Sequence, residues 1–535
     1  MRRITLWLLI CALSIPLIIP FIRSGYFTTH DGEWAIIRLT ELHRELRDLQ
    51  FPPRWAGFLN HGYGYPLFLF TYPLPYYVGE VLHLIGFGFT NAIKGVFIIS
   101  IIGSGVAMFE LGKKWWGVWG GLISAVFYLY APFRLTDLYI RGSIGESLAF
   151  VFFPLLFLWG EKAVRKKGFF DSLFFIISLS ALILAHNVFA VLFSPVLFGF
   201  LLLVVILEKK EIPKRLLFLF LLFIGAFGLA ATFWLPALFE KQYTVLASGA
   251  LTGLSDQFTT LLQLFRFPSS RSVFSLQIGI GHLIGFLLGC SMVGRSKTLS
   301  FLRPYFLFFT LCVVVMIFLT LPPSLFLWKS LPVFSSVDFA WRYLGPLQFI
   351  LSFGAGVLGL MRIKPFAIII GIWIMVMNSA LIQPTGYFQK DDLYYLTNDA
   401  TTTAFDELMP VWVTQKPRVF TNEKVVIPSH KGTITIEENR ATLLSFRAVL
   451  ADSDLVTINT IYFPGWYATV NNVIVKPTIM PSTGLMQLLL PSGESKVRMY
   501  FGQTLIRRIA DYITLGTVFI LLGLTIITFR KKQLL

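Results

Sequence analysis

Long uncharged apolar blocks constrain the fold of this chain more than any other feature. The segment from Leu216 to Leu238 contains no charged residue, and neither does that from Tyr305 to Leu321. A helix needs about 20 apolar residues to cross a bilayer, and in lipid only helices and closed barrels satisfy their own backbone hydrogen bonds. Of the 535 residues, 56% are hydrophobic and 14% charged, whereas soluble proteins have roughly 45–50% and about 25%. The chain is therefore predicted to be a polytopic α-helical membrane protein.

The apolar blocks predict a bundle of about 12–13 transmembrane segments. One block contains Pro73 and Pro75, which disfavour a continuous helix. If Lys113 and Lys114 are cytoplasmic, one segment between residues 66 and 111 cannot cross fully, and a shallow or re-entrant segment at the prolines would restore the alternation of sides. The candidate segments are 4–22, 66–86, 91–111, 117–133, 147–163, 170–186, 188–207, 215–237, 273–292, 303–321, 340–360, 364–383 and 511–529.

Basic residues cluster at the ends of these blocks. The formal net charge is +17, which in a soluble protein would suggest nucleic acid. Here the clustering is typical of topology signals, because cytoplasmic loops are enriched in Lys and Arg. Arg2-Arg3 and Arg530-Lys531-Lys532 then place both termini in the cytoplasm. We predict a multi-pass protein of the plasma membrane that contacts membrane lipids and no nucleic acid. The first block is expected to be an uncleaved helix rather than a signal peptide, since no small-x-small site follows it.

The segment 385–508 differs in character from the rest. Charged residues return, and β-branched residues alternate with polar ones in 441–449, 455–462 and 496–501, which predicts strands. Pro464-Gly465 and Asn471-Asn472 predict turns. We therefore expect three parts: a transmembrane domain over 1–384 with a first outer loop at 23–65, a small β-sandwich-like extracytoplasmic domain over 385–508, and a final helix with a basic tail over 509–535.

The first outer loop carries two carboxylates, Asp31 and Glu33, separated by one glycine. Such a pair could bind a divalent cation such as Mg²⁺ or Mn²⁺, or one carboxylate could act as a general base. In the structural alternative, Asp31 caps the following helix and Glu33 faces the helix dipole. The apolar spacing within 34–50, with Leu39, Leu42, Leu46 and Leu49, predicts an amphipathic helix along the membrane surface.

Further polar residues are expected at the outer ends of the helices. Arg134 and Arg141 lie beside Asp137 and Glu146, and two arginines at the interface suit a lipid phosphate. An internal salt-bridge cluster would explain the same four residues. Other candidates for the substrate site are His186, beside Asn187, together with Arg342 and Tyr65. For these the alternatives are a satisfied structural histidine, an arginine within an aromatic belt, and an interface anchor.

The order of these features resembles that of the GT-C membrane glycosyltransferases: a first helix, an acidic motif at its outer end, an interfacial helix and then many helices. It is also similar to the membrane family called "6-pyruvoyl-tetrahydropterin synthase-related", whose members look like GT-C proteins rather than pterin enzymes. Pro464-Gly465-Trp466 resembles a turn in the outer domain of YfhO-type proteins. The stretches that carry the family resemblance are His30-Asp31, Gly62-Tyr63-Gly64-Tyr65-Pro66, residues 131–142 with Glu146, His186-Asn187, and Phe339-Ala340-Trp341-Arg342-Tyr343.

The resemblance implies transfer of a sugar from a polyprenyl-phosphate donor to a glycan, lipid or protein acceptor outside the cytoplasm. It also implies that Asp31 is the catalytic base or a metal ligand, supported by Glu33. Two other functions stay open at the level of sequence. A transporter or flippase of a lipid-linked intermediate would have discontinuous helices in paired repeats, and no convincing repeat is present. A scaffold in envelope assembly would tolerate substitution of the carboxylates and arginines.

Overall fold

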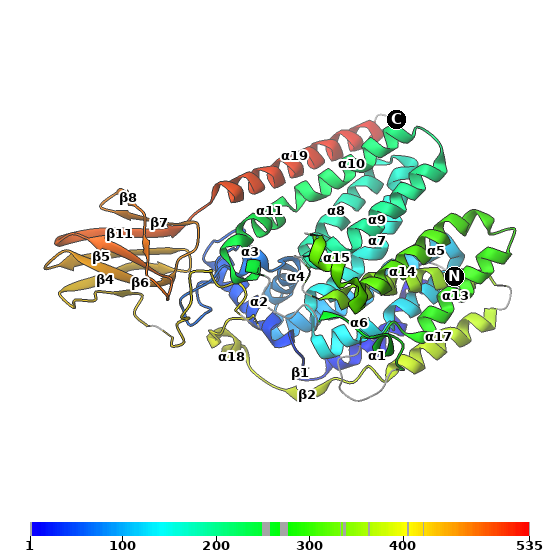
Figure 1. Ribbon diagram of the computed structural model, residues 1–535, viewed down its shortest axis with the longest axis horizontal. Helices are drawn as coiled ribbons and strands as arrows, with labels where there is room; N and C mark the ends of the chain where they lie inside the picture. The colour runs from blue at the N-terminus through cyan, green and yellow to red at the C-terminus, as the bar shows by residue number, and fades with distance from the viewer. Residues whose placement is uncertain are drawn as a thin grey trace.

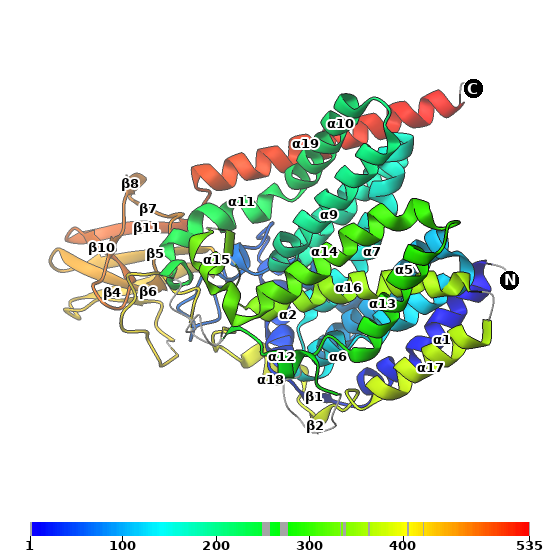
Figure 2. The same ribbon diagram turned by 45° about the vertical axis from the view of Figure 1, so that its right-hand side comes forward.

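The computed structural model describes residues 3–248, 257–267, 276–331, 333–334, 337, 339–361, 364–403, 406–420 and 422–533. Among the predicted features, Arg2 and the first residues of the 273–292 segment lie outside these ranges. The helices form a bundle with a β-domain at one end, and both chain termini lie toward the opposite end (Figures 1 and 2).

Within the described residues, eight helices are long and apolar enough to cross a bilayer, and three further apolar helices are shorter. The long ones are α1 (Arg3–Ile22), α5 (Phe89–Leu129), α7 (Ile144–Lys166), α9 (Asn187–Glu208), α10 (Ile212–Leu229), α14 (Arg303–Thr320), α16 (Leu344–Ala355, with helical turns on both sides) and α19 (Leu505–Gln533). The shorter ones are α8 (Phe169–Ala185), α13 (Ile280–Arg295) and α17 (Lys364–Ser379).

Helix α5 folds back on itself at Gly117, where φ is 72° and the backbone is not helical. A Cβ atom added to Gly112 would lie 2.9 Å from the Cα of Gly121, so these two glycines let the halves pack closely. The halves agree with the separate predicted segments 91–111 and 117–133. Lys113 and Lys114 precede the bend, as expected for a basic turn between two crossings.

Of the two predictions left open for 66–86, a full span and a shallow segment at the prolines, the structure agrees with the second. This region holds only the short helices α3 (Leu67–Phe70) and α4 (Leu74–Leu84), because Pro73 and Pro75 end one helix and begin the next. With α5 folded in two, these eleven apolar helices give twelve apolar helical segments in the described residues, which is within the predicted range. Both ends of the chain lie toward the same end of the bundle (Figures 1 and 2).

The amphipathic helix predicted in the first loop is α2 (Gly32–Arg47). Its residues Ile36, Leu39 and Leu42 are buried, and the helix packs on α4 and α5. The apolar stripe therefore faces other helices of the protein instead of lipid. Leu49 lies beyond the end of the helix and is 83% exposed, so the stripe is shorter than predicted.

The β-domain contains two antiparallel sheets, as predicted for a sandwich. Inward side chains such as Phe446, Ile458, Met486 and Met499 belong to one hydrophobic cluster, and each contributes about 1.5–3 kcal/mol by burial. Asn471 and Asn472 both have positive φ in the predicted turn. The sheets are ordered β3 (Val425–Val426), β6 (Asp454–Ile461), β10 (Leu485–Leu490), β9 (Thr478–Ile479), and β4 (Gly432–Arg440), β5 (Leu443–Leu450), β11 (Gly493–Phe501), β7 (Trp466–Val470), β8 (Val473–Val475).

The first part of the predicted domain 385–508 packs with the first loop instead of the sandwich. Strand β2 (Thr385–Phe388) pairs with β1 (Tyr26–Thr28), and α18 (Asp392–Thr397) packs against α2. The sandwich itself begins at β3. Shorter helices complete the fold: α6 (Pro132–Thr136), α11 (Ala231–Glu240), α12 (Leu261–Leu264) and α15 (Leu325–Ser330).

Candidate functional site

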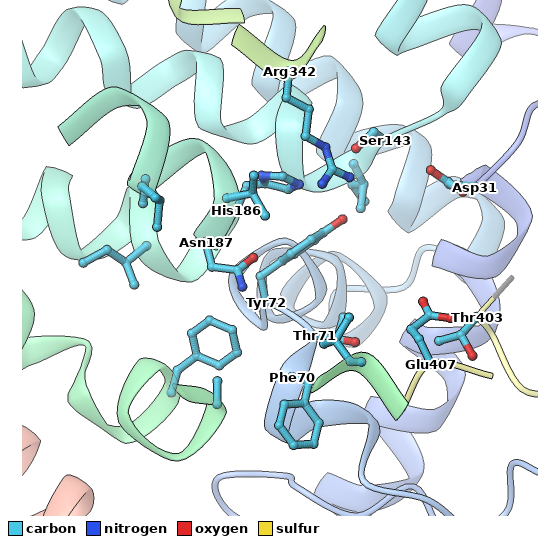
Figure 3. A pocket seen from close by; sticks show the side chains of 18 of the residues that line it. Asp31, Phe70, Thr71, Tyr72, Ser143, His186, Asn187, Arg342, Thr403 and Glu407 are labelled. Carbon is cyan, nitrogen blue, oxygen red and sulfur yellow. The ribbon is translucent and has the colours of Figure 1, made fainter. Parts of the chain in front are cut away.

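A cavity of about 900 Å³ lies where the first loop, the helix ends and the segment before the sandwich meet. Figure 3 shows Asp31 on one wall, Arg342 and His186 on another, and Tyr72 between them. Arg141 also lines the cavity, so four of the predicted site residues share it. Apolar side chains of α9, α10 and α11 form a further wall, including Val191, Phe227, Phe233 and Trp234.

Asp31 is held by its backbone, and its side chain faces the cavity. The backbone N–H of Asp31 donates to the carbonyl of Arg141 at 2.7 Å, and that of His30 donates to Ile140 at 3.0 Å. The hydroxyl of Thr29 accepts from the first N–H of α2, Gly32, at 3.0 Å. Asp31 stands at the N-cap position but makes no capping hydrogen bond through its side chain. Its carboxylate, 40% exposed, is thus available for chemistry.

Arg141 lies at the centre of a buried cluster of charged side chains next to Asp31. Its Nη1 lies 2.6 Å from Asp137 Oδ1 and 2.7 Å from Glu146 Oε2, and its Nη2 lies 3.9 Å from Asp31 Oδ2. Burial alone would lower the pKa of Arg141, but the carboxylates of Glu146, Asp137 and Asp31 raise it above the usual value. The guanidinium therefore stays charged. For Asp137, burial and then the neighbouring Glu146 raise the pKa, while Arg141 opposes them.

Glu146 joins this cluster to the other predicted residues. It is fully buried, and its Oε1 lies 3.1 Å from Nε of Arg342 and 3.6 Å from Nε2 of His186. His186 also caps α9, because its Nδ1 accepts from the N–H of Phe189 at 3.1 Å. The structure contains the internal salt-bridge cluster, and the binding of a lipid phosphate stays a prediction. Asp137 and Glu146 belong to an internal salt-bridge cluster, and Arg141, His186 and Arg342 reach from that cluster to the cavity.

Arg134 lies apart from the cavity. Its Nη2 donates to Ser104 Oγ at 2.5 Å, and its guanidinium lies over the rings of Tyr128 and Phe150 at 5.4 and 5.2 Å. The side chain is 1% exposed. Arg134 is therefore not among the side chains that line the cavity, contrary to the prediction, because the helical turn at 132–136 directs it into the bundle rather than toward Asp31.

Glu33 and Tyr65 also do not line the cavity. Glu33 forms an ion pair with Lys390, whereas Asp31 lines the cavity. The predicted cation site required both carboxylates to lie at one position. They lie at different positions, so they do not form that site together. In the described part of the chain, no group of three or more His, Cys, Asp or Glu side chains could hold a metal ion. The hydroxyl of Tyr65 bonds to Thr402 at 3.0 Å, which fixes the loop instead of facing a substrate.

Several residues that line the cavity were not among those predicted from the sequence. Arg38 stands two turns after Asp31 on the same face of α2, a spacing that could have revealed it. It donates to Thr402 and lies 3.4 Å from the hydroxyl of Tyr76. Thr403 and Glu407 also line the cavity (Figure 3). No local pattern marks them, since they reach the cavity only through tertiary folding.

Comparison with known protein families matches residues 69–385 to the family described as "6-pyruvoyl-tetrahydropterin synthase related domain; membrane protein". The match covers more than half of the chain. The chain belongs to this family. The resemblance to this family that was predicted from the sequence is thus confirmed, and so is the assignment to the membrane. A relative described as an uncharacterized protein, from Lactococcus lactis subsp. cremoris (strain MG1363), is 24% identical over an alignment of 346 residues, which covers 60% of this chain and 54% of that protein.

Among solved structures, the arabinofuranosyltransferase AftD from mycobacteria matches with a TM-score of 0.43 and 16% identity. The match covers 71% of this chain and 26% of AftD. The Archaeoglobus fulgidus oligosaccharyltransferase in its apo form matches with a TM-score of 0.40 and 14% identity, over 72% of this chain and 56% of that enzyme. This chain therefore spans about half or less of the length of these relatives.

Proposed function

We propose that this protein is a GT-C-type glycosyltransferase that transfers a sugar from a polyprenyl-phosphate donor to an extracytoplasmic acceptor. The observation that carries the proposal is the convergence of Asp31, Arg141, Arg342 and His186 on one cavity beside an apolar wall. The pocket thus combines a carboxylate, cationic groups and a surface suited to a prenyl chain. Family membership supports a membrane location but does not by itself assign a reaction.

In this mechanism Asp31 is the general base. Its carboxylate accepts the proton of an acceptor hydroxyl while that oxygen forms a bond to the anomeric carbon. The bond from the anomeric carbon to the phosphate oxygen breaks, and the electron pair leaves with the lipid phosphate. Arg342, whose guanidinium faces the cavity beside Tyr72 (Figure 3), would stabilise the negative charge on the phosphate.

Arg141 has a different role, because its Nη1 is occupied by two carboxyl groups, those of Asp137 and Glu146, at 2.6 and 2.7 Å. It is a positioning residue: its carbonyl holds the backbone of Asp31 and its Nη2 faces the carboxylate. A divalent cation remains a proposal for this site, with Asp31 as a ligand. The cation would stabilise charge on the departing phosphate.

The test compares Asp31→Asn with the matched control Glu33→Gln. The full chain in lipid nanodiscs is incubated with radiolabelled undecaprenyl-phosphate hexoses and pentoses and with membrane extract as the source of acceptor. We expect the wild type to transfer label and Asp31→Asn to lose roughly 10²–10⁴-fold in rate. Glu33→Gln should retain activity, because its side chain pairs with Lys390 outside the cavity.

Equal activity of Asp31→Asn and wild type would reject the role of Asp31. The flippase alternative makes a different prediction. It requires movement of the labelled lipid across a sealed vesicle without appearance of label on an acceptor, in both the wild type and Asp31→Asn.

A further inference from the structure

A second cavity, of about 430 Å³, lies at the end of the bundle where the chain begins. It is formed between the start of α1, the part of α5 before Gly117, and the last turns of α7. Four basic side chains and a single acid line it: Arg3, Lys113, Lys114, Lys162 and Glu110. The catalytic proposal uses none of these residues.

Two of the basic groups are already neutralised. Arg3 lies 3.1 Å from Glu110, which also accepts from the indole N–H of Trp7 at 2.8 Å. Lys114 lies 2.6 Å from Glu161. Lys113 and Lys162 differ. The described residues show no salt bridge for either, and their ammonium groups lie 5.6 Å from the ring of Phe109 and 4.0 Å from that of Trp159. The cavity therefore carries an excess of positive charge.

The remaining walls of the cavity are apolar. Val106, Ala107, Leu155 and Leu158 line it deeper between the helices, and Trp7 is 37% exposed at its edge. A soluble phosphate would bind the ammonium groups and leave this apolar surface uncovered. A lipid would cover both, with its headgroup at the lysines and an acyl chain along α1, α5 and α7. Basic pockets between transmembrane helices are suited to anionic lipid headgroups.

We propose that this cavity binds an anionic phospholipid, with Lys113 and Lys162 contacting the phosphodiester. The site is independent of the glycosyltransferase assignment and lies away from the cavity that contains Asp31. Tryptophan at the edge agrees with a position at the depth of the headgroups, where amphipathic rings are favoured. A bound lipid would contact α1, α5 and α7 together and would hold these three helices against one another.

The test is native mass spectrometry of the purified full chain with phosphatidylglycerol, with phosphatidylcholine of the same acyl chains, and with glycerol 3-phosphate. We expect phosphatidylglycerol to bind preferentially. Each basic residue near an anionic lipid surface is worth roughly fivefold in affinity. Lys113→Gln combined with Lys162→Gln should therefore weaken binding of phosphatidylglycerol roughly 25-fold. The control combines Lys210→Gln with Lys297→Gln, two exposed residues at other helix ends, and should leave binding unchanged.

Three results would overturn the proposal: equal binding of the two lipids by the wild type, an equal loss in the control pair, or displacement of phosphatidylglycerol by glycerol 3-phosphate. The last result would assign the cavity to a soluble phosphate. If the double variant does not fold, two measurements still test the proposal. The first is the preference of the wild type for phosphatidylglycerol, which needs no variant. The second is the affinity of each single lysine variant, which should be roughly fivefold weaker.

Discussion

At the scale of residues, the position of Asp31 depends on two neighbours with no chemical role. Thr29 caps α2, so that Asp31 does not have to. Gly142 has φ of 65°, and a Cβ atom there would lie 2.5 Å from Thr29 Oγ1 and 2.9 Å from the backbone N of Gly32. The loop that holds Arg141 can therefore approach the start of α2 only if residue 142 has no side chain.

Gly142→Ala should displace Asp31 without removing any polar group. The left-handed backbone costs a non-glycine residue about 1–2 kcal/mol, and the clash with Thr29 adds to it. We expect a loss of transfer activity together with a lower melting temperature, measured by fluorescence-detected size exclusion after heating. Gly294→Ala is the matched control, since its added Cβ would meet no atom within 4 Å and should change neither quantity. Full activity of Gly142→Ala would contradict this account of how Asp31 is positioned.

At the scale of elements, α2 connects to the return loop through two buried carboxyl groups. Glu41 accepts from the N–H of Phe58 and Glu45 from that of Gly57, both at 3.1 Å. Burial, and for Glu45 next the neighbouring Glu41, raises the pKa of each group. Each group therefore keeps its proton to a higher pH in the folded chain than in the unfolded chain.

This pair makes stability dependent on pH. A carboxyl whose folded pKa is raised stabilises the fold fully below its unfolded pKa, near 4.5, and loses that contribution as the pH rises through the folded value. The contribution of this pair to the melting temperature of the wild type should therefore fall as the pH increases above 4.5. Glu41→Gln keeps the oxygen that Phe58 needs and removes one charge, so it should flatten the curve. An exposed control, Asp452→Asn, should follow the wild type. A curve for Glu41→Gln with the same slope as that of the wild type would contradict the raised pKa.

A second connection between elements is the ion pair of Arg507 with Glu240. Both side chains are buried, at 2.7 Å, and Arg507 also donates to the carbonyls of Pro464 and Gly502. One guanidinium thus joins α11, the sandwich and the start of α19. Since α11 forms part of the wall of the cavity that contains Asp31, this contact also supports that wall.

Arg507→Ala should be strongly destabilising, by about 3–5 kcal/mol, because it leaves the Glu240 carboxylate buried without its cation. Thermal aggregation of the detergent-purified protein measures the effect. The neighbouring Arg508→Ala is a suitable control, because this side chain is exposed. A similar melting temperature for both variants would show that the pair contributes little.

At the scale of the whole molecule, the sandwich lies at one end of the helical bundle and the chain termini lie toward the other (Figure 2). The basic ends of the helices predict that the termini are cytoplasmic. The first loop and the sandwich would then face the outside and would meet acceptors there.

Cysteine labelling tests this orientation. Val473→Cys lies in the sandwich at a position that is 64% exposed, and a membrane-impermeant maleimide should label it in intact cells. Lys210→Cys, between α9 and α10, should react only after lysis. The native cysteines Cys11, Cys290 and Cys312 are partly buried, so the unsubstituted protein measures background. The reverse pattern of labelling would invert the proposed topology and exclude an extracytoplasmic acceptor.

The sequence by itself determined those features that depend on local pattern. The length of the apolar blocks predicted most of the apolar helices, because a chain segment in a bilayer must be a helix or part of a closed barrel. The alternation of β-branched and polar residues predicted the strands of the sandwich. The prolines at 73 and 75 marked the segment that does not cross. Only the tertiary structure decided which polar groups meet. Arg134 and Arg141 are seven residues apart in similar surroundings, yet one packs into the bundle and the other beneath Asp31. Likewise, Glu33 turns to Lys390 while Glu407, far along the chain, reaches the cavity. Side-chain direction depends on long-range packing, which local sequence does not record.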